Sequence, residues 1–149
     1  MSTITGKFIV LEGGDGSGKD TQIERLKKEL SINEYLFVRD PGSTEIGQQL
    51  REIVLHDKRL ARQAELLTYL AARVQLVEEL VRPTIESGRH VISHRFDLST
   101  IAYQIYGRER HGMLDFVRQI SDYALGGITP DLVVWLNCPP QEGMERVMN

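Results

Sequence analysis

The sequence has little of several features that mark particular classes of protein. It contains one cysteine, Cys138, among 149 residues, so no disulfide can form within the chain. No apolar run approaches the roughly 20 residues that a membrane-spanning helix requires. Acidic residues number 21 and basic residues 18, and the resulting net charge of −3 argues against a nucleic-acid-binding surface. We therefore expect a cytoplasmic protein that binds neither membranes nor nucleic acid.

Short apolar runs alternate with longer amphipathic segments along the chain. Strands are predicted at residues 7–12, 35–39, 90–93 and 132–136. Helices are predicted at residues 19–31, 44–55, 61–86, 97–105 and 112–125, and a last helix begins near Gln141. This alternation indicates a single α/β domain over residues 1–149, with a mostly parallel sheet covered by helices on both faces.

The predicted sheet also indicates where a ligand would bind. Ligands of such sheets bind at the carboxyl ends of the strands, so the loops after residues 12, 39, 93 and 136 should share one crevice. In the longest predicted helix, helical spacing predicts one apolar face made of Leu67, Leu70, Val74, Val77 and Val81.

A glycine-rich loop joins the first predicted strand to the first predicted helix. Residues 13–20 match the pattern G-x-x-x-x-G-K-[ST] in all but the last position. Glycines allow successive N–H groups to point inward around an anion, and the helix N-terminus adds positive charge. The alternative is a glycine-rich turn without a ligand, but the order of strand, loop, lysine and helix favours phosphate binding. The residues predicted to hold the phosphates of a nucleotide are Gly13, Gly14, Asp15, Gly16, Ser17, Gly18, Lys19, Asp20 and Thr21.

Asp20 stands where the pattern has a hydroxyl that normally holds magnesium. A carboxylate there brings negative charge close to the phosphates. It is also a hard oxygen ligand, and we expect it to bind the magnesium ion directly. The next hydroxyl, on Thr21, should point elsewhere along the helix.

Polar side chains follow the second and third predicted strands as well. Arg39 and Asp40 precede a Pro-Gly turn, where a helix capped by Ser43 or Thr44 begins, and a functional role for either of the first two stays open. After the third strand, Arg95 suits an anionic phosphate. Ser99, Thr100 and Gln104 offer hydrogen bonds to a base, although a capped helix with a polar face would also explain them.

Tyr69 and Arg73 lie one turn apart on the longest predicted helix. An aromatic ring and a planar cation at this spacing can stack on a nucleobase and donate hydrogen bonds to it. The alternative is an arginine that packs on a tyrosine at the surface.

Taken in order, these segments resemble the thymidylate kinase family, most closely its bacterial type. The resemblance rests on residues 11–19, 39–42, 69–75, 95–104 and 130–132. It implies the nucleoside monophosphate kinase fold, a P-loop NTPase-type α/β fold. It further implies phosphorylation of dTMP to dTDP by ATP, Mg²⁺ as cofactor, and a homodimer formed through helices such as the longest one.

The resemblance also implies a role for each site residue. Lys19, Asp15 and Arg95 would form the catalytic set, with Lys19 on the ATP phosphates and Arg95 on the dTMP phosphate. Asp15 would also bind the dTMP sugar and, with Asp20, the metal. Tyr69 would stack on thymine and Arg73 would donate a hydrogen bond to it. The other residues implied to bind dTMP are Asp40, Pro41, Arg51, Ser99, Thr100, Tyr103 and Gln104.

The chain departs from the family pattern after the third strand, where His94 replaces an aspartate. We hypothesise that the carboxylate has moved to Asp20, which serves the metal or pairs with His94. A separation beyond about 8 Å would exclude such a pair, because even one bridging water could not span it.

The family pattern continues beyond the counterpart of Asn149 with an arginine-bearing lid, an adenine-contacting loop and a fifth strand. We expect the 149-residue domain to lack these parts, which leaves its activity open. Two alternatives remain: a kinase for another deoxynucleoside monophosphate, and a nucleotide-binding protein with weak or no phosphotransfer.

Overall fold

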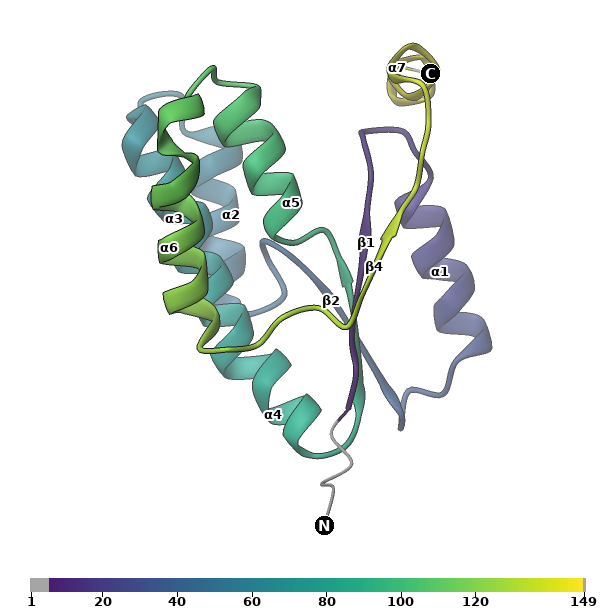
Figure 1. Ribbon diagram of the computed structural model, residues 1–149. Helices are drawn as coiled ribbons and strands as arrows, with labels where there is room; N and C mark the ends of the chain where they lie inside the picture. The colour runs from purple at the N-terminus through teal and green to yellow at the C-terminus, as the bar shows by residue number, and fades with distance from the viewer. Residues whose placement is uncertain (1–5, 149) are drawn as a thin grey trace.

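The protein is built around a four-stranded parallel sheet (Figure 1). A computed structural model describes residues 6–148. The strands are β1 (Phe8–Glu12), β2 (Tyr35–Arg39), β3 (His90–His94) and β4 (Leu132–Trp135), in the order β2-β3-β1-β4. All three strand pairs are parallel, which confirms the predicted α/β class.

Helices cover both faces of this sheet, as predicted. Helix α1 (Lys19–Glu29) packs on one face, and the remaining helices up to α6 gather on the other (Figure 1). These are α2 (Glu45–His56), α3 (Arg62–Leu76), α4 (Arg82–Glu86), α5 (Asp97–Thr100) and α6 (Leu114–Leu125). The last helix, α7 (Pro140–Met148), lies beyond the carboxyl end of β4 (Figure 1). Of the two caps considered for α2, the structure has Thr44, whose hydroxyl accepts from the N–H of Gly47 at 2.8 Å.

The predicted helix over residues 61–86 is one continuous helical run with a change of pitch. Between α3 and α4 lies a π-helical segment, η1 (Val77–Val81), in which the N–H of Arg82 bonds to Val77. Pro83 offers no N–H and its ring would clash with the preceding turn of a regular α-helix, so the wider segment accommodates it. A second π-helical segment, η2 (Ile101–Tyr106), extends α5, and a short 3₁₀ turn, η3 (His111–Met113), precedes α6.

The predicted apolar face of this long helix is partly wrong. Leu67 is 50% exposed, and Leu66 is buried in its place. The buried residues run through Leu66, Leu70, Arg73, Val77 and Val81. The buried face is rotated relative to the predicted one because the charged Arg73 turns inward to pair with the buried carboxylate of Asp40. Hydropathy along the sequence does not reveal such a pair.

The strands alternate between two apolar cores. Phe8 and Val10 of β1 face the core beneath η1, where Phe8 meets Phe96 edge-on with ring centroids 4.9 Å apart. Leu11, from the alternate position, packs against Ile23 of α1 on the opposite face. Both faces of the central strands are therefore buried, which fixes the carboxyl ends of β1 and β3 side by side.

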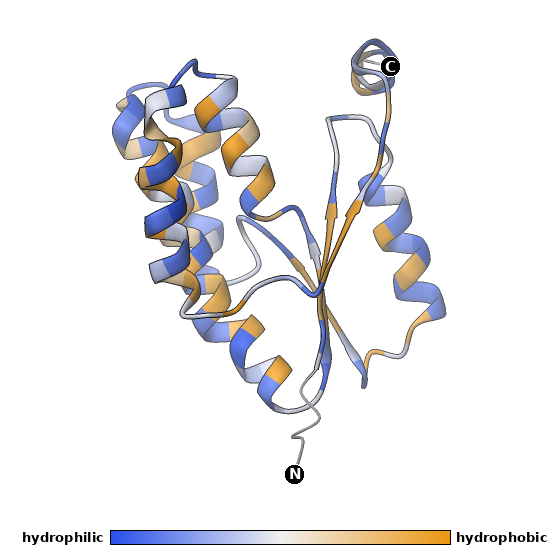
Figure 2. Cartoon of the chain, in the orientation of Figure 1, coloured by the Kyte–Doolittle hydropathy of each residue, from blue (hydrophilic) through white to orange (hydrophobic). Residues whose placement is uncertain are grey.

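The outer strand β4 is covered much less than the central ones. Its four side chains are 36–59% exposed, and Figure 2 shows the strand as an apolar band at one side of the sheet. Within residues 6–148, no helix is long and apolar enough to cross a membrane.

Candidate active site

The glycine-rich loop after β1 folds back over the start of α1. Gly16 and Gly18 have φ angles of 70° and 90°, and these left-handed values explain the need for glycine. Gly14 does not have a left-handed φ and an added Cβ would touch nothing, so its own conformation does not require glycine. Lys19 is buried, and its Nζ donates to the carbonyls of Gly13 at 2.9 Å and Gly14 at 2.6 Å. Burial and the nearby cation Arg95 lower the pKa of Lys19.

Asp20 faces two side chains from the neighbouring strands. Its Oδ1 accepts from Nη2 of Arg39 and lies 3.4 Å from Nε2 of His94. This distance is well within the roughly 8 Å beyond which a pair of Asp20 and His94 would be excluded, so the hypothesis of such a pair stands.

The ionisation of His94 and Asp20 depends on burial and on the neighbouring charges. Burial lowers the pKa of His94 to about 4, and Arg39 adds to the effect. Burial alone would raise the pKa of Asp20, but His94 and Arg39 lower it below its ordinary value. His94 is neutral above about pH 4, so at neutral pH the charged side chain that pairs with Asp20 is Arg39.

Arg95 links the loop to the helix after β3. Its Nη2 donates to Asp15 at 2.6 Å, and its Nη1 donates to Ser99 at 2.9 Å. Asp15 also accepts from the hydroxyl of Tyr103 at 2.9 Å. The backbone of Arg95 has a φ of 68°, a strained value for a residue other than glycine, which is typical of functional sites.

Glu12 supports this site, although the sequence reasoning assigned it no role. It is 1% exposed at the end of β1, and its carboxylate accepts from the N–H of Phe96 at 2.8 Å and the hydroxyl of Ser99 at 2.6 Å. Ser99 in turn accepts from Arg95, so Glu12 holds the side chain that orients Arg95. The available signal was a carboxylate at the last position of an apolar strand, where burial without partners would be costly.

A buried ion pair forms the opposite wall of the site. Nε of Arg73 donates to Asp40 at 2.7 Å, and both side chains are at most 2% exposed. Nη2 of Arg73 also donates to Thr100 at 2.6 Å and to the carbonyl of Phe96 at 3.1 Å. Burial raises the pKa of Asp40, and the guanidinium of Arg73 offsets part of the rise. Nη1 of Arg73 and Oδ1 of Asp40 have no hydrogen-bond partner among the described residues.

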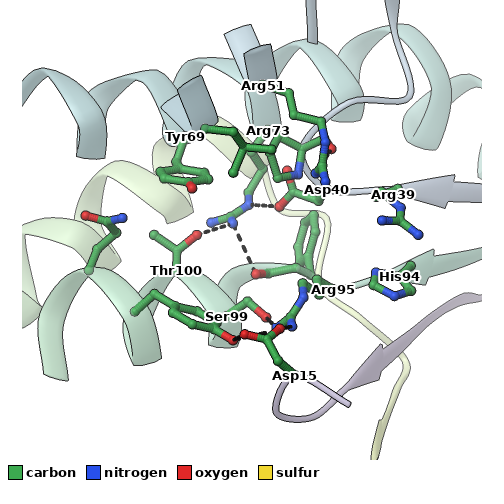
Figure 3. Close-up of a pocket in the computed structure, with 15 residues that line it drawn as sticks. Asp15, Arg39, Asp40, Arg51, Tyr69, Arg73, His94, Arg95, Ser99 and Thr100 are labelled. Carbon is green, nitrogen blue, oxygen red and sulfur yellow. Dashed lines mark hydrogen bonds and ion pairs between the residues drawn. The ribbon is translucent and has the colours of Figure 1, made fainter. Parts of the chain in front are cut away.

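A cavity of about 320 Å³ lies at the carboxyl ends of β1, β2 and β3 (Figure 3). Glu12, Lys19 and Asp20 lie close to it but are not among its lining residues. The structure brings together every residue expected to bind dTMP: Asp15, Asp40, Pro41, Arg51, Tyr69, Arg73, Arg95, Ser99, Thr100, Tyr103 and Gln104. It adds four residues that were not assigned to the pocket: Arg39, Leu55, His94 and Phe96. Arg51 is held by the carbonyl of Pro41 at 3.0 Å.

The loop after β4 does not line this cavity, which corrects the expectation of four converging loops. In the sheet order, β4 lies beyond β1, on the side away from β3. Its continuation instead supports the glycine-rich loop: Arg146 of α7 donates to the carbonyl of Gly16 at 3.1 Å.

A phosphate-binding loop and a polar cavity at the carboxyl edge of a parallel sheet define a P-loop enzyme of the nucleotide kinase class. Residues 11–149 match the sequence model of the family described as thymidylate kinase. The chain belongs to the thymidylate kinase family, whose members phosphorylate dTMP to dTDP with ATP.

Individual relatives agree with this assignment. A thymidylate kinase from Prochlorococcus marinus (strain MIT 9313) is 42% identical over 153 aligned residues, which cover 96% of this chain and 70% of that protein. A thymidylate kinase from Legionella pneumophila (strain Corby) is 39% identical, with 98% and 70% covered. The crystal structure of thymidylate kinase from Ehrlichia chaffeensis matches with a TM-score of 0.80 at 28% identity, over 96% of this chain and 82% of that one.

Replacing Glu12 by Gln should lower the unfolding free energy by about 1–3 kcal/mol, because one oxygen that accepts from Ser99 becomes an amide donor. Urea unfolding measures the change. Glu24→Gln, at an exposed position on α1, is the matched control and should change stability by less than about 0.5 kcal/mol. Equal effects at the two positions would contradict the bonding described for Glu12.

The stability of the protein should fall as the pH drops from about 7 to about 4. His94 has a folded-state pKa of about 4 against an ordinary 6.5, so between these values the unfolded chain takes up a proton that the folded chain does not. The expected loss is on the order of 3 kcal/mol. Urea unfolding at several pH values should show a shallower pH slope for His94→Gln than for the wild type, and identical slopes would refute the buried neutral imidazole.

Proposed function

We propose that this chain transfers the γ-phosphoryl group of ATP to the 5′-phosphate of dTMP in the cavity beside its phosphate-binding loop. The observation that carries the proposal is the placement of Asp15, which belongs to the loop and also lines the cavity. Nucleotides held by the loop and by the cavity would therefore meet there with their phosphates adjacent. Phosphoryl transfer depends mainly on such positioning and on cations around the migrating group.

The end of the cavity formed by α3 and η2 suits a pyrimidine base. Within the part of the chain that the structure describes, Nη1 of Arg73 is a buried donor without a partner, and Oε1 of Gln104 is a buried acceptor without one. Thymine presents carbonyl oxygens and an N–H, so it complements both atoms. Tyr69 lines the same cavity and offers an aromatic ring for stacking (Figure 3).

The other end of the cavity suits the phosphate and the sugar of the monophosphate. Arg95, with Arg51 across the cavity, supplies guanidinium groups that bind phosphate oxygens in pairs. Asp15 and Tyr103, bonded to each other at 2.9 Å, would contact the sugar hydroxyl. The remaining wall comes from Asp40, Pro41, Ser99 and Thr100.

The loop from Gly13 to Thr21 would hold the phosphates of ATP. Lys19 lies within the loop, bonded to the carbonyls of Gly13 and Gly14. It would exchange these bonds for oxygens of the outer phosphates, where its charge stabilises the transferring group.

Magnesium would be held by Asp20, with Asp15 as a second carboxylate. The carboxylate oxygens fit this ion, which prefers hard oxygen ligands and binds proteins through one or two carboxylates. Asp20 sits in the first turn of α1, where the loop pattern normally places the hydroxyl for magnesium. A magnesium ion held there would supply positive charge to neutralise the phosphates during transfer.

We also infer a homodimer and a cytoplasmic location. Apolar side chains on the outer helices support the dimer: Ile46 and Ile53 of α2, Leu67 of α3 and Phe116 of α6 are 43–50% exposed. Burying such residues against a second copy would be favourable.

One observation favours binding without transfer as a second candidate. The carboxylate of Asp20 is paired with Arg39 and would lie close to the phosphates of ATP. If it repels them without recruiting a metal, the protein would bind dTMP but turn over slowly.

A coupled assay of ADP release, with isothermal titration beside it, tests the proposal. We expect ADP release with dTMP, and weaker turnover with dCMP, dAMP and dGMP. Tight dTMP binding without ADP release would reject the enzyme in favour of the second candidate. Turnover that prefers another monophosphate would show that the base assignment is wrong.

Arg73→Lys should weaken dTMP binding by about tenfold or more and leave ATP binding unchanged. Lysine keeps the charge opposite Asp40 but loses the planar fork that includes Nη1. Arg73→Ala is less informative, because an unpaired buried Asp40 would cost about 3–5 kcal/mol of stability. Isothermal titration with each nucleotide measures both affinities, and equal losses for dTMP and ATP would contradict the base contact.

A further inference from the structure

His94 is a buried imidazole at the carboxyl end of β3. It ends β3 between two neighbours, in register with Leu11 of β1 and Arg39 of β2. Its side chain is 6% exposed, and neither Nδ1 nor Nε2 has a hydrogen-bond partner among the described residues. A buried, neutral imidazole of this kind has a lone pair available to a metal ion.

The distance between His94 and Asp20 suits two ligands of one ion. Metal–nitrogen and metal–oxygen bonds are about 2.1 Å long, so two ligands at 90–109° lie about 3.0–3.4 Å apart. Nε2 of His94 and Oδ1 of Asp20 are 3.4 Å apart. A direct hydrogen bond between the same atoms would be shorter, near 2.9 Å.

We propose that Nε2 of His94 and Oδ1 of Asp20 together bind the divalent cation of the nucleotide, and that this mixed site prefers Mn²⁺ or Co²⁺ to Mg²⁺. Phosphate oxygens and water complete the coordination. The inference rests on the proposed function, because it deepens the role given there to Asp20.

The preference follows from the donor atoms. Carboxylates and phosphates suit magnesium, whereas imidazole nitrogen suits first-row transition metals, whose affinity for nitrogen and oxygen ligands rises from Mn²⁺ to Co²⁺. Two protein ligands are too few for a resident metal site, and no group of three or more His, Cys, Asp or Glu residues among residues 6–148 lies close enough to hold an ion. The cations Lys19, Arg39 and Arg95 lie around His94 and oppose a bare metal ion. The ion therefore enters together with the phosphates.

Arg39 must give up Asp20 when the ion binds. Its guanidinium pairs with the same Oδ1 that faces His94. The Arg39 side chain is 43% exposed, so it can turn toward solvent or toward the phosphates without disturbing the core. Arg39 thus neutralises Asp20 whenever the metal is absent.

Pulsed electron paramagnetic resonance of Mn²⁺ tests the proposal. The sample is the full chain saturated with β,γ-methylene-ATP, an analogue without a nitrogen between its phosphates. We expect ¹⁴N modulation from a directly bound imidazole in the wild type and its loss in His94→Gln. The matched control is His56→Gln, which removes an exposed histidine on α2 and should keep the signal.

Competition between Mn²⁺ and Mg²⁺ for the same complex gives a second readout. The ratio of the two affinities should fall by at least about tenfold in His94→Gln, since the loss of even an outer partner of a metal costs that much. An unchanged ratio, or a wild type without imidazole modulation, would overturn the inference. If Asp20→Asn then still weakens Mn²⁺ binding, the proposed role of Asp20 stands although the inference fails. If the imidazole signal is present but dTMP is not phosphorylated, the inference stands and the proposed function fails.

Discussion

The buried ion pair between Asp40 and Arg73 is the interaction on which the rest of the site depends. It joins the carboxyl end of β2 to the last turn of α3, and through Thr100 and the carbonyl of Phe96 it reaches α5. A charge pair at most 2% exposed is costly unless its hydrogen bonds are nearly all satisfied. The pair therefore holds three elements in one arrangement and turns Arg73 inward. Arg73 lines the cavity, and its Nη1 has no hydrogen-bond partner within residues 6–148.

On the opposite wall, a second buried carboxylate, that of Glu12, holds the neighbouring elements in place through its hydrogen bonds. Glu12 closes the end of β1, bonds to the start of α5 and holds Ser99, which orients Arg95 toward Asp15 of the phosphate loop. The two walls meet at α5, since Arg73 bonds to Thr100 and Glu12 bonds to Ser99. The short helix α5 is held from one side by the Asp40–Arg73 pair and from the other by Glu12. It thus sets the distance between a base bound at Arg73 and a phosphate bound at Arg95.

Much of this arrangement could be predicted from the sequence because it rests on local patterns. The apolar strands, the glycine-rich loop and the helices have strong periodic or positional signals, and the residues after β1, β2 and β3 converge because the sheet is parallel. What escaped prediction depends on tertiary partners. The burial of Glu12 and the inward turn of Arg73 require a buried polar partner, which hydropathy does not encode. The absence of the β4 loop from the cavity depends on the strand order β2-β3-β1-β4.

The central claim is that Arg73 reads the base of dTMP while Arg95 holds its phosphate. A crystal structure of the full chain with dTMP bound tests it most directly. The account predicts Nη1 of Arg73 within about 3.2 Å of a thymine carbonyl oxygen, with the Asp40 pair intact and the phosphate on Arg95. A dTMP molecule whose base lies away from Arg73, or whose phosphate lies away from Arg95, would contradict it.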